Sequence, residues 1–218
     1  MASAVQPVAL DPPRALAAAD LRSAFKPRDE KDAWRELAPF WNLDVASGEP
    51  CEAAQRQQVR CFKGPSSIDF VRRLGRPGIV STRDEAGRTV HALLVGLTDQ
   101  VALLQTAEGP RSITLASFIK AWIGNFATFW RVPPGYTGPI GEGDTGPTVD
   151  YLAAQLARLA GEPPPVGAQT MDAALKRKVA RFQSTHGLKA LGTAGPTTFM
   201  QLNRATGVEE PWLRLQAQ

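Results

Sequence analysis

The sequence predicts an α+β fold in which helices flank one antiparallel sheet. Apolar residues recur at helical spacing in residues 29–74 and again after residue 147. Between these segments the chain becomes rich in β-branched residues from Ile79 onward and is punctuated by turn residues, as antiparallel strands are. Residues 133–146 are rich in Gly and Pro and have no apolar period, which predicts a linker between two domains.

Each element can be assigned from its local pattern. The expected helices span residues 16–26, 29–40, 51–58, 66–74, 115–123, 148–159, 170–186 and 196–206. The expected strands span residues 79–82, 89–97, 101–104, 112–114 and 125–131. Ser66 and Thr170 are the expected N-caps of two of these helices, because their hydroxyls can accept from backbone N–H groups. The tail after Gly207 is expected to pack back on the fold.

Composition limits the classes of function. The chain has 218 residues, a net charge of +4 and a pI near 9.3. This basic balance suits an anionic partner, and it is equally compatible with a soluble basic domain that has no polyanion partner. No block of five basic residues occurs, so nucleic acid is not an expected partner. No run of 18 apolar residues and no signal peptide is visible. Two His and two Cys without metal-ligand spacing predict neither a metal site nor a cofactor.

The stretch Val179–Thr198 reads VARFQSTHGLKALGTAGPTT. An apolar helix ends in Phe-Gln, Gly187-Leu188 follows, and Gly192 and Gly195 precede a new helix opened by a proline. This order resembles the type 1 peptidoglycan-binding domain, a small three-helix module. The resemblance implies that residues 147–218 form such a module.

A wider set of motifs resembles the general secretion pathway protein A family over about residues 34–212. The motifs are Pro50–Ala53, Cys61, Arg76–Pro77, Ala92–Leu97, Trp122–Tyr136 and Phe199–Asn203. The resemblance implies a periplasmic location, as the exported half of an inner-membrane protein whose ATPase and membrane anchor lie outside this chain. It also implies peptidoglycan, secretion-system assembly proteins and a secretin as partners, and leaves a homo-oligomer open.

Within that half, residues 28–132 are similar to cysteine peptidases that cleave double-glycine leader peptides, which have a papain-like fold. Residues 1–27 would then be a poorly ordered or helical extension. Cys51 and His91 fall where those enzymes have the nucleophile and base, but Gln105 falls where they have an Asp. Because a neutral Gln cannot stabilise an imidazolium, we expect a degenerate, inactive peptidase domain.

Cys51 has three readings. In an oxidising compartment, Cys51 and Cys61 are expected to form a disulfide, which requires the helix between them to stop near Gln58 and turn. The alternatives are two free thiols, or an active thiolate at a helix N-terminus near His91.

The C-terminal module carries the expected ligand-binding residues. A groove for peptidoglycan needs amide donors and acceptors, hydroxyls and positive charge. The residues that could supply these are Arg181, Gln183, Ser184, Gly187, Leu188, Gly192, Gly195 and Thr197. Gln183 alternatively bonds the backbone of the loop that follows it, and Leu191 stands where the family has an Asp.

We therefore expect a non-enzymatic, peptidoglycan-binding periplasmic region of a type II secretion assembly protein. It would attach the factor to the cell wall and help place the outer-membrane secretin. Two alternatives remain open from the sequence. One is a wall-targeted cysteine peptidase or amidase that uses Cys51 and His91, and the other is a protein–protein adaptor.

Overall fold

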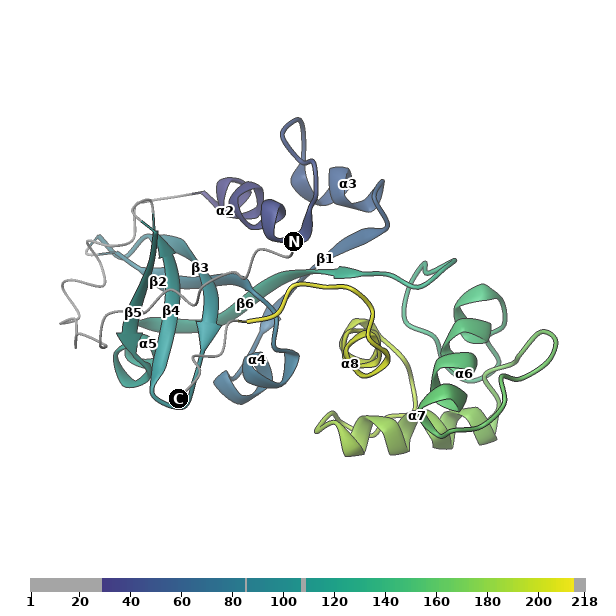
Figure 1. The fold of residues 1–218 in the computed structure, drawn as a ribbon. Helices are drawn as coiled ribbons and strands as arrows, with labels where there is room; N and C mark the ends of the chain where they lie inside the picture. The colour runs from purple at the N-terminus through teal and green to yellow at the C-terminus, as the bar shows by residue number, and fades with distance from the viewer. Residues whose placement is uncertain (1–28, 85, 107–108, 214–218) are drawn as a thin grey trace, which may run out of the picture.

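A computed structural model describes residues 29–84, 86–106 and 109–213 (Figure 1). The helix expected at residues 16–26 and the extension around it lie outside the described residues. In chain order the elements are α2 (Glu30–Leu37), η1 (Ala38–Trp41), α3 (Pro50–Gln55), β1 (Val59–Pro65), α4 (Ile68–Leu74), β2 (Gly78–Arg83), β3 (Thr89–Leu97), β4 (Val101–Thr106), β5 (Gly109–Thr114), α5 (Leu115–Ala121), β6 (Trp122–Arg131), α6 (Pro147–Leu159), α7 (Ala173–Thr185) and α8 (Pro196–Thr206).

Six strands form one antiparallel sheet in the order β1-β6-β2-β3-β4-β5. The α+β class predicted from the sequence is therefore confirmed. The sheet places Ser81 directly opposite His91 and Leu93 directly opposite Gln105. Since side chains alternate along a strand, all four lie on the same face of the sheet.

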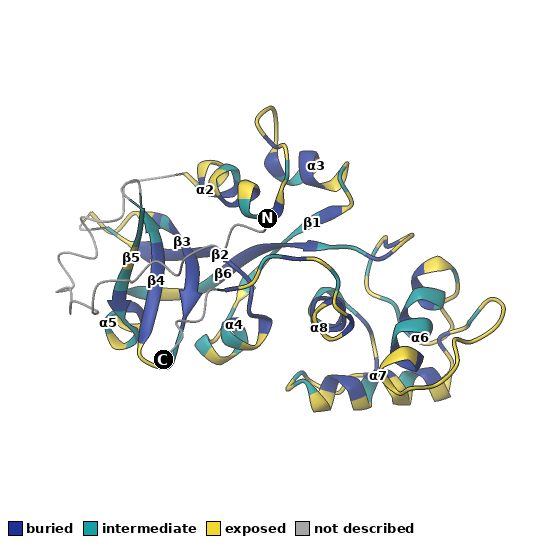
Figure 2. Cartoon of the chain, in the orientation of Figure 1, coloured by how far each residue is buried: buried dark blue, intermediate teal, exposed yellow. Residues whose placement is uncertain are grey.

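Helices cover both faces of the sheet, and each face has its own buried core (Figure 2). On the first face α2, η1 and α3 cover apolar residues such as Leu93 and Phe129. On the second face α4, α5 and the C-terminal helices pack on residues such as Leu94, Phe126 and Trp130. This double cover explains why β3 is apolar at nearly every position, because both of its faces are buried.

The second core continues across the boundary that the sequence predicts at residues 133–146. Tyr136, within that segment, packs edge-on against Trp130 of β6 and Phe199 of α8, with ring centroids 5.0 and 5.5 Å apart. The tail packs back as predicted, since the Leu213 N–H donates to the Gly75 carbonyl at 2.7 Å. We call residues 30–131 the sheet region and residues 147–213 the C-terminal helical region.

One buried ion pair joins these two regions. The Arg76 guanidinium contacts the Glu210 carboxylate, and neither side chain is exposed to solvent. Arg76 also donates to the Met200 carbonyl at 2.7 Å. Glu210 accepts further hydrogen bonds from the Arg131 backbone at 2.9 Å and from Asn203 at 3.0 Å. Burial lowers the pKa of Arg76, and the Glu210 carboxylate opposes that shift.

Strand β1 was missed by the sequence prediction. The helix expected over residues 51–58 ends at Gln55, because residues 56–58 turn and Gln58 adopts a left-handed conformation with φ of 58°. Residues 59–65 then pair with β6 over their whole length. Strand β6 also begins at Trp122 rather than at residue 125.

The predicted N-caps Ser66 and Thr170 were wrong as well. The Ser67 hydroxyl and the Asp172 carboxylate cap α4 and α7, accepting from the backbone N–H three residues ahead. Ser66 instead donates its N–H to the Gly124 carbonyl of β6, so it extends the sheet edge.

Candidate functional site

Cys51, His91 and Gln105 are the residues that the resemblance places at the peptidase positions. Cys51 of α3 is joined by a disulfide to Cys61 of β1, with Cα atoms 5.6 Å apart. Strands β6 and β2 lie between β1 and β3, which carries His91. With its sulfur bonded to Cys61, Cys51 presents no thiol in this structure. Cys51 as a nucleophile with His91 as its base stays an alternative prediction.

A cluster of polar side chains surrounds His91 on β3. Helix α2 lies over β3, and Glu30 in its first turn lines a small cavity with Lys63, Ser81 and His91. The Glu30 carboxylate accepts from the Lys63 ammonium at 2.6 and 2.8 Å. The His91 Nδ1 atom lies 3.1 Å from the Ser81 hydroxyl. Nothing in the sequence pattern connects Glu30 to a strand 61 residues later, so this cluster was missed.

Burial sets the ionisation of this cluster. Desolvation lowers the pKa of His91, and the nearby Glu30 carboxylate counters this only in part. Partial burial acts to raise the pKa of Glu30, but the hydrogen bond and charge of Lys63 outweigh it, so the pKa of Glu30 is lowered. At neutral pH the cluster therefore holds a neutral imidazole beside a carboxylate–ammonium pair.

The cluster has no room for a substrate. Its cavity measures about 10 Å³, roughly the volume that admits one water molecule. Gln105 lies diagonally from His91 in the sheet, and its amide donates to the Thr106 carbonyl at 3.2 Å. The arrangement can fix α2 on the sheet, but it presents neither a thiolate nor an open cleft to a peptide.

In the C-terminal helical region, Gln183 serves its own loop rather than the solvent. Its carbonyl accepts from the Gly192 N–H at 2.9 Å, and its amide donates to the Thr193 carbonyl and the Thr198 hydroxyl at 2.7 and 2.9 Å. Only 3% of Gln183 is exposed, so its side chain does not face a ligand in this structure. The alternative interpretation, a bond to the following loop, fits the geometry.

The other predicted ligand residues lie around the C-terminal end of α7. Arg181, Ser184 and Gly187 are exposed, whereas the backbone of Gly192 is buried. Three more are half-buried: Leu188, Gly195 and Thr197. These positions form a surface around the Gly-rich loop, and Gly187 adopts φ of +67° at the turn that ends the helix.

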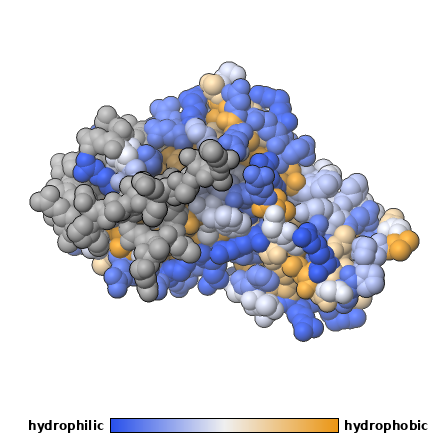
Figure 3. All heavy atoms as spheres, in the orientation of Figure 1, coloured by the Kyte–Doolittle hydropathy of each residue, from blue (hydrophilic) through white to orange (hydrophobic). Residues whose placement is uncertain are grey.

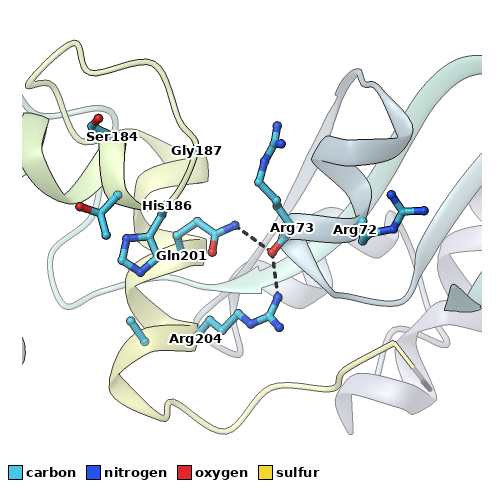
Figure 4. A pocket seen from close by; sticks show the side chains of 9 residues that line it. Arg72, Arg73, Ser184, His186, Gly187, Gln201 and Arg204 are labelled. Atoms are coloured by element: carbon cyan, nitrogen blue, oxygen red, sulfur yellow. Dashed lines mark hydrogen bonds between the residues drawn. The ribbon is translucent and has the colours of Figure 1, made fainter. Parts of the chain in front are cut away.

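A cleft that the sequence did not reveal lies beside this surface. Its volume is about 810 Å³, and it lies between α4 of the sheet region and α7 and α8 of the C-terminal helical region (Figure 4). Of the eight predicted ligand residues, Ser184 and Gly187 line it. Figure 3 shows a mainly hydrophilic surface, with apolar side chains in small groups over the C-terminal helices.

Two features are absent from the part of the chain that the structure describes. No group of three or more His, Cys, Asp or Glu side chains there could hold a metal ion. Within the same residues, no helix has both the length and the apolar character needed to cross a bilayer.

Known proteins resemble this chain over most of its length. No protein-family model matches it. It is 30% identical over 187 residues to General secretion pathway protein A of Aeromonas hydrophila, which covers 85% of this chain and 34% of that protein. Over these residues the chain is a homologue of that protein. It spans about a third of the length of this curated relative.

A solved structure shares the fold over most of the chain. A periplasmic domain of the EpsAB fusion protein of the Vibrio vulnificus type II secretion system superposes with a TM-score of 0.58 and 18% identity, covering 87% of this chain and 84% of that one. This match extends over both the sheet region and the C-terminal helices. The peptidase domain of Streptococcus mutans ComA aligns with 49% of this chain and 98% of its own, at 13% identity and a TM-score of 0.36.

Proposed function

We propose that this chain is a periplasmic part of a type II secretion protein that binds peptidoglycan through its C-terminal helical region. The observation that carries the proposal is the similarity to General secretion pathway protein A across 187 residues. The surface at the end of α7 and the Gly-rich loop after it supports the proposal, because the exposed Arg181 guanidinium, the Ser184 hydroxyl and backbone groups match the polar chemistry of cell-wall polymer. The role of the whole protein would be to attach an assembly factor to the wall and help place the secretin.

We further propose that the sheet region is not an enzyme. The disulfide occupies the only two cysteines of the chain, so no thiol is left to act as a nucleophile. The polar cluster at His91 lacks space for a peptide. Thiol titration of the denatured, unreduced protein tests this directly. Less than 0.1 thiol per chain is expected, whereas one or two free thiols would restore the peptidase hypothesis.

Wall binding is tested by co-sedimentation of the whole chain with purified insoluble peptidoglycan. We expect the protein to pellet with peptidoglycan and to be released by soluble muropeptides. An unrelated basic protein of similar pI serves as the control, because charge alone also attracts proteins to the anionic wall. Pelleting no greater than that of the control would refute the proposed binding.

A further inference from the structure

We infer that the cleft between α4 and the C-terminal helices is a carboxylate-recognition site for the peptide part of peptidoglycan. This inference rests on the proposed function. It places the binding site between the two regions, because each region contributes part of the lining. The cleft is lined from the sheet region by Arg72 and Arg73, and from the C-terminal helical region by Ser184, His186, Gly187 and Arg204. Its volume of about 810 Å³ falls within the range of small-molecule sites.

The cleft holds unbalanced positive charge. Arg72 is paired with Asp69 and Asp99 at 3.1 and 3.4 Å, so its charge is largely matched. Within the described residues, neither Arg73 nor Arg204 has a carboxylate partner. Two arginines therefore line one hollow without a counter-charge from the described residues. An anionic ligand would supply that charge.

The Arg204 side chain is positioned before any ligand arrives. Arg204 donates to the Arg73 carbonyl at 2.8 Å, and Gln201 donates to the same oxygen at 3.0 Å (Figure 4). The Arg204 guanidinium also lies 5.2 Å from the centre of the Trp212 ring, which it faces as a cation–π contact. This arrangement ties the C-terminal end of α4 to α8, while the Arg73 side chain points away from that contact and packs against Gly187.

Gly187 lets Arg73 approach the C-terminal helical region. A Cβ atom at Gly187 would lie 3.0 Å from the Arg73 Cδ atom, closer than ordinary packing allows. Gly187 is therefore needed both for the left-handed turn after α7 and for the close approach of an arginine from the other region. The Arg73 stem packs against this backbone while its charged end stays exposed.

The side chains suit a carboxylate that belongs to a peptide. A guanidinium presents two parallel N–H donors that match the two oxygens of a carboxylate. The Ser184 hydroxyl and the His186 imidazole, on the opposite wall, can bond the amides of a short peptide. Peptidoglycan peptides carry free carboxylates among amide bonds, so they combine both features. The site would then read the peptide rather than the sugar chain.

Isothermal titration with a soluble disaccharide-tetrapeptide, released from peptidoglycan, tests the site. The same muropeptide with its carboxylates converted to carboxamides is the matched ligand. We expect the wild-type chain to bind the acid form at least tenfold more tightly than the amide form. Arg73→Ala should weaken acid binding by about tenfold to a hundredfold, the usual range for one charged hydrogen-bonded contact.

Arg177→Ala is the matched control variant. It removes one exposed arginine from α7 about 10 Å along the helix from the cleft, so it lowers the net charge equally. This variant should bind the muropeptide as the wild type does. Arg73→Lys keeps the charge but loses the planar pair of donors, and we expect it to recover only part of the affinity.

The outcomes separate this inference from the proposed function. Equal binding of acid and amide forms, or an unchanged affinity in Arg73→Ala, would overturn the carboxylate site even if the protein pellets with peptidoglycan. Cleft-dependent binding of the soluble peptide without pelleting would support the site and refute wall attachment. Another outcome is that the chain fails to bind the peptide and binds phosphatidylglycerol vesicles in an Arg73-dependent way. That result would overturn the peptide assignment in favour of a lipid phosphate.

Discussion

Removing the Glu210 carboxylate should destabilise the whole chain. In Glu210→Ala, the Arg76 guanidinium remains buried without a counter-charge, and its Nε and Nη1 atoms already have no hydrogen-bond acceptor among the described residues. Breaking a buried ion pair from one side costs about 3–5 kcal/mol. The Arg131 N–H and the Asn203 amide also lose an acceptor, so we expect the upper half of that range.

Equilibrium urea unfolding measures this cost. With a slope of about 2 kcal/mol per molar, a loss of 4–5 kcal/mol moves the midpoint down by about 2 M. Glu209→Ala is the matched control, because the neighbouring Glu209 is exposed and only its backbone carbonyl is used, as an acceptor for Arg131. The control should lower the free energy of unfolding by less than about 0.5 kcal/mol. A loss below 1 kcal/mol in Glu210→Ala would refute the claim that this pair holds the two regions together.

Three further predictions concern local features. Reducing the Cys51–Cys61 disulfide should lower the free energy of unfolding in urea by about 3 kcal/mol, the expected entropy contribution for a sequence separation of 10. A urea midpoint that does not change with reductant would contradict this. Gln183→Ala leaves the buried Gly192 N–H without its acceptor and should cost about 1–3 kcal/mol; a neutral result would mean that water replaces the amide. Because burial lowers the pKa of His91, the unfolded chain takes up its proton more readily, so stability should fall as pH drops below about 6.5, with a slope of at most about 1.4 kcal/mol per pH unit. His91→Gln should flatten that part of the urea-midpoint profile, and an unchanged slope between pH 5 and 7 would exclude His91 as its source.

The sequence predicted most helices and strands because each carries its own local signal. The C-terminal helices have apolar residues at helical spacing and begin at proline or next to a capping side chain. Strand β3 is apolar over most of its length and is bounded by turns. Strand β1 carries no such signal. It combines Arg60, Lys63, Gly64 and Pro65 with a few apolar residues, and it is a strand because β6 pairs with it some 70 residues later.

The candidate sites were predicted less completely than the fold for the same physical reason. The sequence distinguishes a Gly-rich loop, but not that Gln183 would turn inward to hold it. It places Cys51 at a helix start, but the strand that carries its disulfide partner Cys61 is recognised only when β6 pairs with it. The arginine cleft needs α4 and α8 side by side, and residues 73 and 204 are linked by no local pattern.

The Arg76–Glu210 pair and the proposed carboxylate site depend on the same alignment of helices. Arg76 follows α4 by two residues and bonds the Met200 carbonyl within α8, so it fixes one helix against the other. Arg73 and Arg204 lie on those two helices and meet across the cleft through the Arg73 carbonyl. Loss of the buried pair would therefore loosen the alignment of α4 and α8 on which the cleft depends. Conversely, a ligand that contacts residues of both regions would stabilise only the docked state, by RT ln(1 + [L]/Kd). Wall binding and docking of the two regions would then be one linked equilibrium, in which the sheet region contributes structure and charge to recognition.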